Sequence, residues 1–433
     1  TTNAYVDNTT NNTVRFISVN HSYGEKDRNT VFNIEPGSVI ELYGRNDGHM
    51  TVGVEYQSFN ALPAVVINEG EIILADGKNL MGASIMLESQ RDDTAPRGCL
   101  YENTGSSTLN NLCGVLVRKP LEESAFLNKN KIVINSRESI GIDFAKYNYD
   151  STKNPLTIYV ESGNIDINGS MNYGIRIPNI FMSYSSGEKY FDETVINGDT
   201  GIINVAGEKN TGISIGRRIS GSAAVTAYNG LVQSDAADII GNIRNLDIVL
   251  NGSQGTGVLR NANFTDKNQG NISLTDTHIK NLAFGDNAQN SVLIRSDKYG
   301  VILEKNLNVN NTNEINNSTE NVVMMANDYN NLGSKKTFVE NKAVITIGKN
   351  LEQTTGLLSA NGGNLINTGT IIVTSNNSQG LAVLGSSYSG NEASGTNSGN
   401  ITVSGNKAAG VYNSGSFNMN SGIIDISGNQ SIG

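Results

Sequence analysis

The sequence predicts an all-β fold, a right-handed parallel β-helix (β-solenoid) with loop insertions. Three observations predict it. A short Gly-x-apolar-x-apolar-x-Gly frame recurs along the 433 residues, its apolar positions are almost all β-branched, and its copies are spaced by about one solenoid coil. The composition agrees, because 47 Gly, only 6 Pro and 17% charged residues suit a polar β-structure with many turns.

The frame is strict in seven stretches, and its third and fifth positions are the apolar ones. β-Branched side chains favour short strands, and the alternation of apolar and other residues places one face inward. The seventh position is Gly or Ser in every copy, which predicts a sharp turn there. The seven apolar pairs are Ile132/Ile134, Ile165/Ile167, Ile203/Val205, Ile248/Leu250, Ile371/Val373, Ile401/Val403 and Ile424/Ile426.

The spacing between copies indicates how the strands are arranged. The copies that begin at Gly399 and Gly422 are 23 residues apart, which is enough for two or three short strands with their turns. Such a unit is one coil of a solenoid and stacks about 4.8 Å above the next. We expect columns of Ile and Val inside the stack and ladders of Asn at the bends. For any single Asn the alternative is that it only tolerates turn dihedrals.

The frame also predicts the domain organisation. Residues 1–60 are expected to form irregular or N-terminal β-helix coils, and residues 61–433 the β-helix rod. Insertions are expected at 88–123, 147–155, 181–194 and 310–341, because the spacing lengthens there. In solenoids insertions lie beside the rod, where function tends to reside. The frame stops at Gly433 without a polar capping segment, which predicts a fragment of a longer chain.

The first insertion contains both cysteines, Cys99 and Cys113. A disulfide between them would close a short loop, stabilise it by about 3 kcal/mol and indicate an oxidising, extracytoplasmic setting. Two unpaired thiols in a reducing cytosol are the alternative. A loop pinned in this way is pre-organised for binding, and Arg97 and Tyr101 are its candidate ligand-binding residues, although each could simply be solvated.

The insertion at 181–194 has the other recognition pattern. Its aromatic residues Tyr184, Tyr190 and Phe191 alternate with charged residues, which suits stacking on sugar rings or anchoring a protein partner. Packing of this loop back onto the rod is an equal alternative.

Signals of enzyme chemistry are poor, so the sequence predicts no enzyme, no cofactor and no metal site. There are three His, no catalytic or phosphate-binding motif is recognisable, and the acids Asp166, Asp247 and Asp425 stand singly at outward strand positions. A net charge of −10 without basic clusters argues against nucleic acid as a partner. No apolar stretch approaches the ~18 residues of a membrane span.

Stretches such as GNITVSGNKAAGVYNSGSFNMNSGIIDISGN and NTGTIIVTSNNSQGLAV resemble passenger domains of type V autotransporters. The resemblance is to the very large fusobacterial outer-membrane adhesins, of the RadD-like and galactose-binding types, and it covers about Ala64 to Gly433. It implies an extracellular passenger at the cell surface, joined to the outer membrane only through a C-terminal β-barrel that this sequence lacks. The cysteine pair departs from the usual Cys-free passenger.

The hypothesis from the sequence is therefore a surface-exposed adhesin ectodomain. The resemblance implies attachment to host cell-surface proteins or glycans and to partner bacteria, and weak contacts from several loops would add up through avidity. Two alternatives stay open. One is a carbohydrate-active β-helix enzyme, a lyase or a glycosidase, and the other is a purely structural spacer rod.

Overall fold

The computed structural model describes about two thirds of the chain, and all regular structure in that part is β-strand. Two compact units are present: unit 1 (Thr1–Asn204, Ile213–Leu246 and Asn263–Gln269) and unit 2 (Val205–Gly212, Asp247–Ala262 and Gly270–Gly433). The described residues are 3–7, 14–21, 30–44, 51–58, 64–77, 80–87, 125–128, 130–144, 158–161, 163–177, 194–197, 201–215, 243–244, 246–260, 272–274, 279–297, 299–309, 318–328, 337–385 and 392–433.

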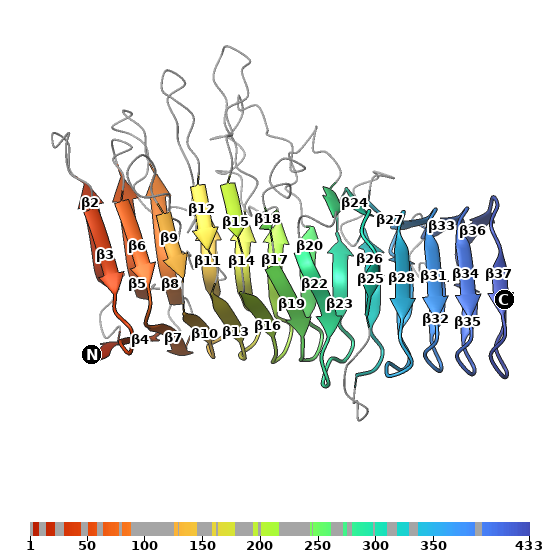
Figure 1. The fold of residues 1–433 in the computed structure, drawn as a ribbon, viewed down its shortest axis with the longest axis horizontal. Helices are drawn as coiled ribbons and strands as arrows, with labels where there is room; N and C mark the ends of the chain where they lie inside the picture. The colour runs from red at the N-terminus through yellow and green to blue at the C-terminus, as the bar shows by residue number, and fades with distance from the viewer. Residues whose placement is uncertain are drawn as a thin grey trace, which may run out of the picture. The chain divides into compact units, whose positions relative to one another are not determined.

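In unit 1 strands that are three apart along the chain lie in the same sheet (Figure 1), except that the third set of strands is divided between two sheets of three strands each. Each strand therefore has position 1, 2 or 3 in a three-strand repeat. Position 1 is β1 (Asn3–Asp7), β4 (Val39–Tyr43), β7 (Glu71–Asp76), β10 (Lys131–Ile134), β13 (Asn164–Ile167) and β16 (Ile202–Val205). Position 2 is β2 (Val14–His21), β5 (Thr51–Ser58), β8 (Leu80–Leu87), β11 (Ile140–Phe144), β14 (Tyr173–Ile177) and β17 (Thr211–Ile215). Position 3 is β3 (Thr30–Ile34), β6 (Ala64–Asn68), β9 (Ala125–Asn128), β12 (Ile158–Glu161), β15 (Thr194–Asn197) and β18 (Ile243–Arg244).

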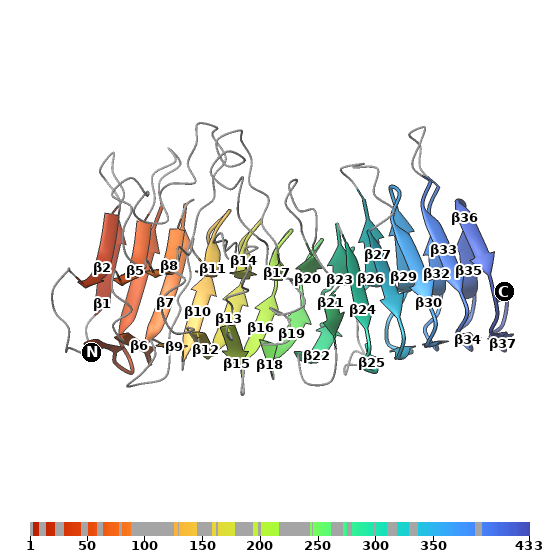
Figure 2. The ribbon, with the colours of Figure 1, turned by 90° about the horizontal axis from the view of Figure 1, so that it is seen from above.

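Unit 2 repeats the same order, and Figure 2 shows β29, β32 and β35 side by side. Position 1 is β19 (Leu246–Leu250), β22 (Ile279–Phe284), β25 (Leu307–Asn308), β28 (Val344–Ile347), β31 (Thr370–Val373), β34 (Asn400–Val403) and β37 (Ile424–Ile426). Position 2 is β20 (Thr256–Arg260), β23 (Val292–Ser296), β26 (Val322–Asn327), β29 (Thr355–Ala360), β32 (Gln379–Val383) and β35 (Ala409–Asn413). Position 3 is β21 (Ile272–Leu274), β24 (Gly300–Leu303), β27 (Phe338–Asn341), β30 (Asn364–Asn367), β33 (Ser394–Asn397) and β36 (Ser416–Met419).

The strands stack in parallel and in register. Ile132 of β10 lies beside Ile165 of β13, and Ile371 of β31 lies beside Ile401 of β34. In-register stacking places like side chains in columns that run along each sheet. The prediction of an all-β fold built from parallel, stacked strands is thus confirmed.

The core of each unit includes the apolar pairs that the repeated frame predicts. Six of the seven pairs are 0–1% exposed, and the strands that carry them alternate between buried and partly exposed residues, as in β10 and β31. The seventh pair, Ile424 and Ile426, is partly exposed, because β37 is the outermost strand of its sheet. Each buried aliphatic side chain contributes about 1.5–3 kcal/mol relative to exposure.

Strands also occur in two tracts where the strict frame is absent. Residues 1–60 contribute β1 to β5, which join the sheets of the later repeats. The tract 310–341, expected as one insertion, contains β26 and β27. Its apolar residues Val322, Val323 and Met324 lack the leading Gly of the frame and lie among Asn-rich stretches, so the frame does not reveal them.

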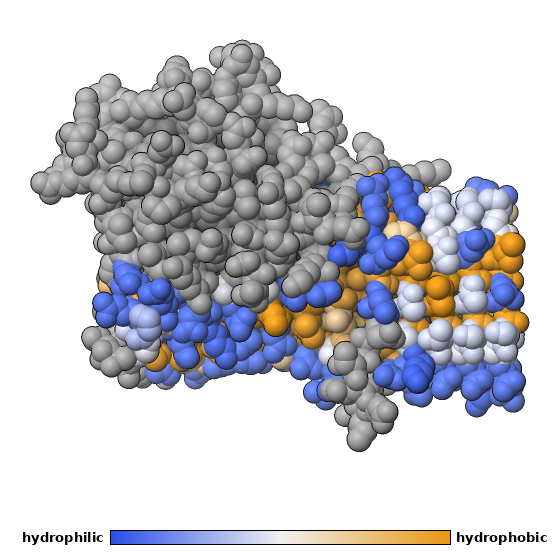
Figure 3. Space-filling model, in the orientation of Figure 1, coloured by the Kyte–Doolittle hydropathy of each residue, from blue (hydrophilic) through white to orange (hydrophobic). Residues whose placement is uncertain are grey.

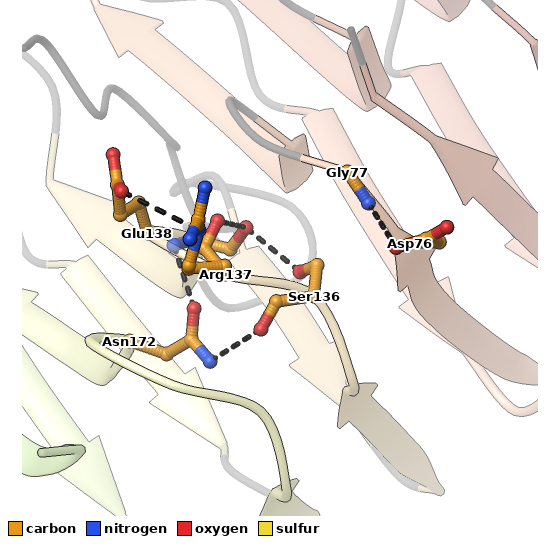
Figure 4. Close-up of polar contacts among 7 residues, drawn as sticks. Asp76, Gly77, Ser136, Arg137, Glu138 and Asn172 are labelled. Carbon is orange, nitrogen blue, oxygen red and sulfur yellow. Dashed lines mark hydrogen bonds and ion pairs between the residues drawn. The ribbon is translucent and has the colours of Figure 1, made fainter. Parts of the chain in front are cut away.

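Corner 1, where the chain passes from position 1 to position 2, is held by a side chain from the following repeat. Asn172 accepts a hydrogen bond through Oδ1 from Ser139 N at 2.7 Å, and its Nδ2 donates to Ser136 O at 2.8 Å (Figure 4). Asn172 is 1% exposed, so the amide satisfies backbone groups that water does not reach. In unit 2 the same bond to a backbone N–H of the preceding repeat is made by Ser291, Asn321, Ser378 and Ser431.

The small residue at the seventh position of the frame lies in corner 1, but the reason for it differs from the one predicted. In the strict copies only Gly207 adopts a positive φ there, whereas the left-handed backbone falls two residues later, at non-Gly residues such as Glu138 (φ 55°) and Lys407 (φ 51°). A Cβ on Gly169 or Gly405 would overlap a carbonyl oxygen of the preceding repeat. At Gly169 and Gly405, close stacking and not turn geometry requires glycine, whereas Ser136 and Ser375 hold a Cβ at the same position of their copies.

Corner 3, where position 3 leads to the next position 1, contains a buried asparagine ladder in unit 2. Asn341 Nδ2 donates to Asn367 Oδ1 at 2.9 Å, and Asn367 Nδ2 donates to Asn397 Oδ1 at 2.7 Å. All three side chains are 0% exposed. The expected ladder of asparagines at the bends is confirmed here, and every rung links one repeat to the next.

The ladder predicts a large cost for removing its middle rung. Asn367→Ala leaves the donor of Asn341 and the acceptor of Asn397 buried without their partner, so the free energy of unfolding should fall by about 3 kcal/mol. Guanidinium denaturation measures it. Asn418→Ala is the control, because Asn418 is exposed and bonds only its neighbour Asn420 among the described contacts. Equal effects of the two changes would contradict the ladder.

The close approach at corner 1 gives a second prediction. Gly405→Ala pushes a Cβ into the backbone carbonyl of Ser375, which cannot move without separating two strands, and should destabilise the protein by about 1–3 kcal/mol. Gly255→Ala is the matched control, since the nearest atom to its Cβ would be Ser291 Oγ at 3.5 Å. Thermal unfolding of both variants tests this, and an unchanged melting temperature for Gly405→Ala would refute the steric reason.

Candidate functional site

Corner 2, where the chain passes from position 2 to position 3, has the widest range of connection lengths. In unit 2 the connections at this corner range from the tight turns 361–363 and 414–415 to longer segments. In unit 1 they include the longest connection between consecutive strands of the chain. Corners 1 and 3 are mostly short and bonded to the neighbouring repeat. The corner 2 connections are 22–29, 59–63, 88–124, 145–157, 178–193 and 216–242 in unit 1, and 261–271, 297–299, 328–337, 361–363, 384–393 and 414–415 in unit 2.

The candidate binding residues from the sequence all belong to two of these connections. Residues 88–124 join β8 to β9, and residues 178–193 join β14 to β15. The binding candidates Arg97, Tyr101, Tyr184, Tyr190 and Phe191, and the cysteines Cys99 and Cys113, lie outside the described residues, as does the insertion 147–155.

The attachment points of the two connections lie close together. Strands β8, β11 and β14 are consecutive in one sheet of unit 1, so the ends of β8 and β14 are two strand spacings apart, or about 10 Å. The connections 88–124 and 178–193 therefore start from the same edge of that sheet. This is the arrangement that a recognition surface shared by the two segments requires.

In unit 2 the described part of corner 2 holds a polar cluster that sequence reasoning missed. The guanidinium of Arg295 binds the Asp297 carboxylate through two bonds, Nε to Oδ1 at 2.6 Å and Nη2 to Oδ2 at 3.1 Å. Asn327 donates to the same carboxylate, and Asn361 Nδ2 donates to Asn327 Oδ1 at 2.8 Å. A bidentate pair of this kind fixes both side chains in one geometry.

A second contact of corner 2 involves Tyr299, which follows Asp297 by two residues in the chain. The guanidinium of Arg260, at the end of β20, lies 5.6 Å from the centre of the Tyr299 ring, and Arg260 is fully buried. Tyr299 has a positive φ of 67°, and its carbonyl accepts a hydrogen bond from Ser296 Oγ at 2.6 Å. Arg260 breaks the apolar pattern of its strand in the sequence, and this interruption is the signal that could have revealed the cluster.

Burial governs the electrostatics of Asp297. Desolvation raises the pKa of the Asp297 carboxyl above its ordinary value of 3.8, while the charge and the hydrogen bond of Arg295 oppose the shift. The side chain is 18% exposed and that of Arg295 is 32% exposed. Because burial outweighs the ion pair, the charged form of Asp297 lowers the stability of the folded state at neutral pH.

Two of the three single acids considered for catalysis are bonded to neighbours on their own sheets. Asp166 Oδ2 pairs with Lys131 Nζ at 2.6 Å, and this hydrogen bond raises the pKa of Lys131. Asn281 Nδ2 donates to Asp247 Oδ1 at 3.1 Å, and Asp425 is exposed. Within the described ranges no three His, Cys, Asp or Glu residues gather in a group that could hold a metal ion.

The chain matches no protein-family model, and it is similar to no curated protein and to no solved structure. In the part of the chain that the structure describes, no helix has the length and apolar character of a membrane span.

The raised pKa of Asp297 gives a pH-dependent prediction. A carboxyl whose pKa is raised on folding binds its proton more tightly in the folded protein, so its cost to stability is present above the folded pKa and disappears as the pH falls through it. Asp297→Asn removes the charge and keeps a hydrogen-bond acceptor for Arg295. Its melting temperature at pH 7 should equal or exceed that of the parent, and the difference should shrink as the pH approaches 3.8.

Asp425→Asn is the control for this measurement, because Asp425 is exposed on β37. Calorimetry across the pH range should show no difference for that variant. A large loss of stability in Asp297→Asn at pH 7 would mean that the ion pair, and not desolvation, dominates at Asp297.

Proposed function

We propose that the described strands belong to a right-handed parallel β-helix that serves as the scaffold of a surface-exposed bacterial adhesin ectodomain. Its partners are host cell-surface proteins or glycans and other bacteria, and its place is the outer surface of the cell. Residues of the corner 2 connections make the contacts. The proposal rests on the pattern of the repeats and on the resemblance of the sequence to autotransporter passengers.

One observation carries the proposal: the longest connections are gathered at one corner of an otherwise constant frame. Corner 1 is completed by a side chain from the next repeat, and corner 3 of unit 2 by the asparagine ladder. A longer segment at either corner has to keep those contacts, as the corner 1 connection 309–321 does through Asn321, which accepts a hydrogen bond from Ser291 N. Corner 2 imposes no such constraint, so its segments can differ in length and sequence without loss of the stack, as recognition requires.

The spacing of the segments supports contact at several points. Adjacent corner 2 connections start about 4.8 Å apart along a sheet, so several segments can reach one ligand surface together. Contacts that are weak one by one then add up, because binding of the first raises the effective concentration of the rest. Tyr184, Tyr190 and Phe191 supply aromatic rings for sugar or protein anchors, and Arg97 and Tyr101 supply a cation and a further ring.

Exchange of the long segments tests this function. Replacing 88–124 and 178–193 by short Gly-Ser connections should leave the melting temperature of the stack unchanged, because corner 2 is bridged by 414–415 alone between β35 and β36. Retention of the protein on a glycan array and on partner bacterial cells should be lost. The matched control replaces 216–242, another long connection of unit 1, and should bind as the parent does.

Three other outcomes would contradict the proposal. Unchanged retention after all three replacements would favour a spacer whose binding part lies elsewhere. Breakdown of a saccharide without retention would favour a lyase or glycosidase. Retention lost only with the 216–242 replacement would assign the contacts to that segment, and not to Arg97, Tyr101, Tyr184, Tyr190 and Phe191.

A further inference from the structure

The last repeats of unit 2 are nearly free of charge. Residues 354–433 contain only three charged residues, Glu392, Lys407 and Asp425, although charged residues make up 17% of the whole chain. In Figure 3 the repeats that are blue in Figure 1 show a face that is largely white and orange, with the hydrophilic colour gathered along one margin. A protein with a net charge of −10 thus has a region where electrostatic repulsion is small.

In this region and in the repeat before it, one sheet carries no charged residue in four successive strands, β26, β29, β32 and β35. We call the outward side chains of these strands the neutral face. Register places Met325, Leu358, Ala382 and Tyr412 in one row across the sheet. Val322, Thr355, Gln379 and Ala409 form a second row.

The first row of the neutral face is apolar and partly open to solvent, whereas Thr355 and Gln379 make the second row partly polar. Tyr412 is 47% exposed on β35, the outermost strand of its sheet, Leu384 beside the end of β32 is 37% exposed, and Met325 and Leu358 are half-buried. Ala382 is 2% exposed because it lies between Leu358 and Tyr412 in the row. Leaving this surface in water costs about 25 cal/mol per Å² of apolar area, which a flat apolar partner would recover.

We propose that the neutral face pairs with the neutral face of a second copy of this chain. Two acidic chains repel each other over most of their surfaces, and the repulsion is smallest where both faces lack charge. Charged polymers and anionic lipids find no counter-charge on these four strands. Two flat sheets can pack face to face about 10 Å apart around a twofold axis, so that each copy contributes the same residues.

The size of the face sets the strength of the pairing. Four strands spaced about 4.8 Å apart, each with five residues rising about 3.3 Å, cover roughly 300 Å² per copy. A stable dimer needs about 800 Å² per partner. The pairing is therefore weak and reversible in solution, and it strengthens when many copies stand side by side, because neighbours then bind at a high effective concentration.

Sedimentation equilibrium of the whole chain tests the inference. The weight-average mass should rise above that of a monomer only as the protein is concentrated, because an interface well below about 800 Å² per partner is weak. Leu358→Lys should weaken association at least tenfold, because a twofold axis brings two ammonium groups together on an uncharged face. Leu358 is outward and half-buried, so the substitution spares the core.

Ile366→Lys is the matched control, because Ile366 is also half-buried and outward but lies on β30, in the adjoining sheet of the same repeat. It should associate as the parent does. Mixing the Leu358→Lys and Leu358→Glu variants should restore association that neither shows alone. This rescue separates a direct contact from damage to the fold.

Four results would overturn the inference. The parent could stay monomeric at every concentration, or Leu358→Lys and Ile366→Lys could weaken association equally. Loss of association in Ile432→Lys alone would assign the contact to the exposed end of the last repeat, where Ile432 is 65% exposed. Glycan-array binding that Leu358→Lys abolishes, without self-association of the parent, would assign the neutral face to a neutral saccharide. The inference does not depend on which corner 2 segment binds a ligand.

Discussion

The close, in-register stacking of parallel strands is the constraint on which the rest of the structure depends. Because each strand lies about one hydrogen-bond spacing from the next, side chains of the same position form columns, and every residue of the frame meets its counterpart in the next repeat. Ile132 and Ile165 form part of such a column in unit 1, as do Asn341, Asn367 and Asn397 in unit 2. The same closeness leaves no room for a Cβ at Gly169 or Gly405.

Stacking also divides the surface into parts that can vary and parts that cannot. Corner 1 and the asparagine ladder of corner 3 bond one repeat to the next, so a change in either affects two repeats. Corner 2 carries connections of many lengths, and in unit 2 it holds the paired Arg295 and Asp297. The connections therefore vary most in length at corner 2, although corner 1 also holds the longer connection 309–321. Strands β26, β29, β32 and β35 of position 2 carry no charged residue.

The period-two Ile and Val pairs were sufficient to predict the strands and their buried face, because a buried column demands the same side-chain type in every repeat. The asparagine ladder was predictable for a similar reason. The reason for the small seventh residue was not predictable, because the carbonyl oxygen that a Cβ would overlap belongs to the preceding repeat and is not indicated by the residues of the turn itself. For the cluster around Asp297 the sequence offers only the interruption of the apolar pattern at Arg260. Its partners could not be predicted, because Arg260, Arg295, Asn327 and Asn361 come from four repeats separated by connections of unequal length, so their spacing in the sequence has no period. The candidates Arg97 and Tyr184 lie outside the described residues, so the structure defines only the strand ends to which their segments are attached.

The side chains that complete corner 1 also give the stack a polarity. The acceptor for Ser139 N belongs to Asn172, in the repeat that follows, and the acceptor for Thr354 N belongs to Ser378. A repeat that docks on the N-terminal side of a folded one meets an acceptor already in position. A repeat that docks on the C-terminal side must bring the acceptor with it, and its own N–H then waits for the next arrival. The two ends of an ordered stretch therefore differ chemically: the N-terminal end presents a side-chain acceptor without its backbone donor, and the C-terminal end presents a backbone N–H without its side-chain acceptor.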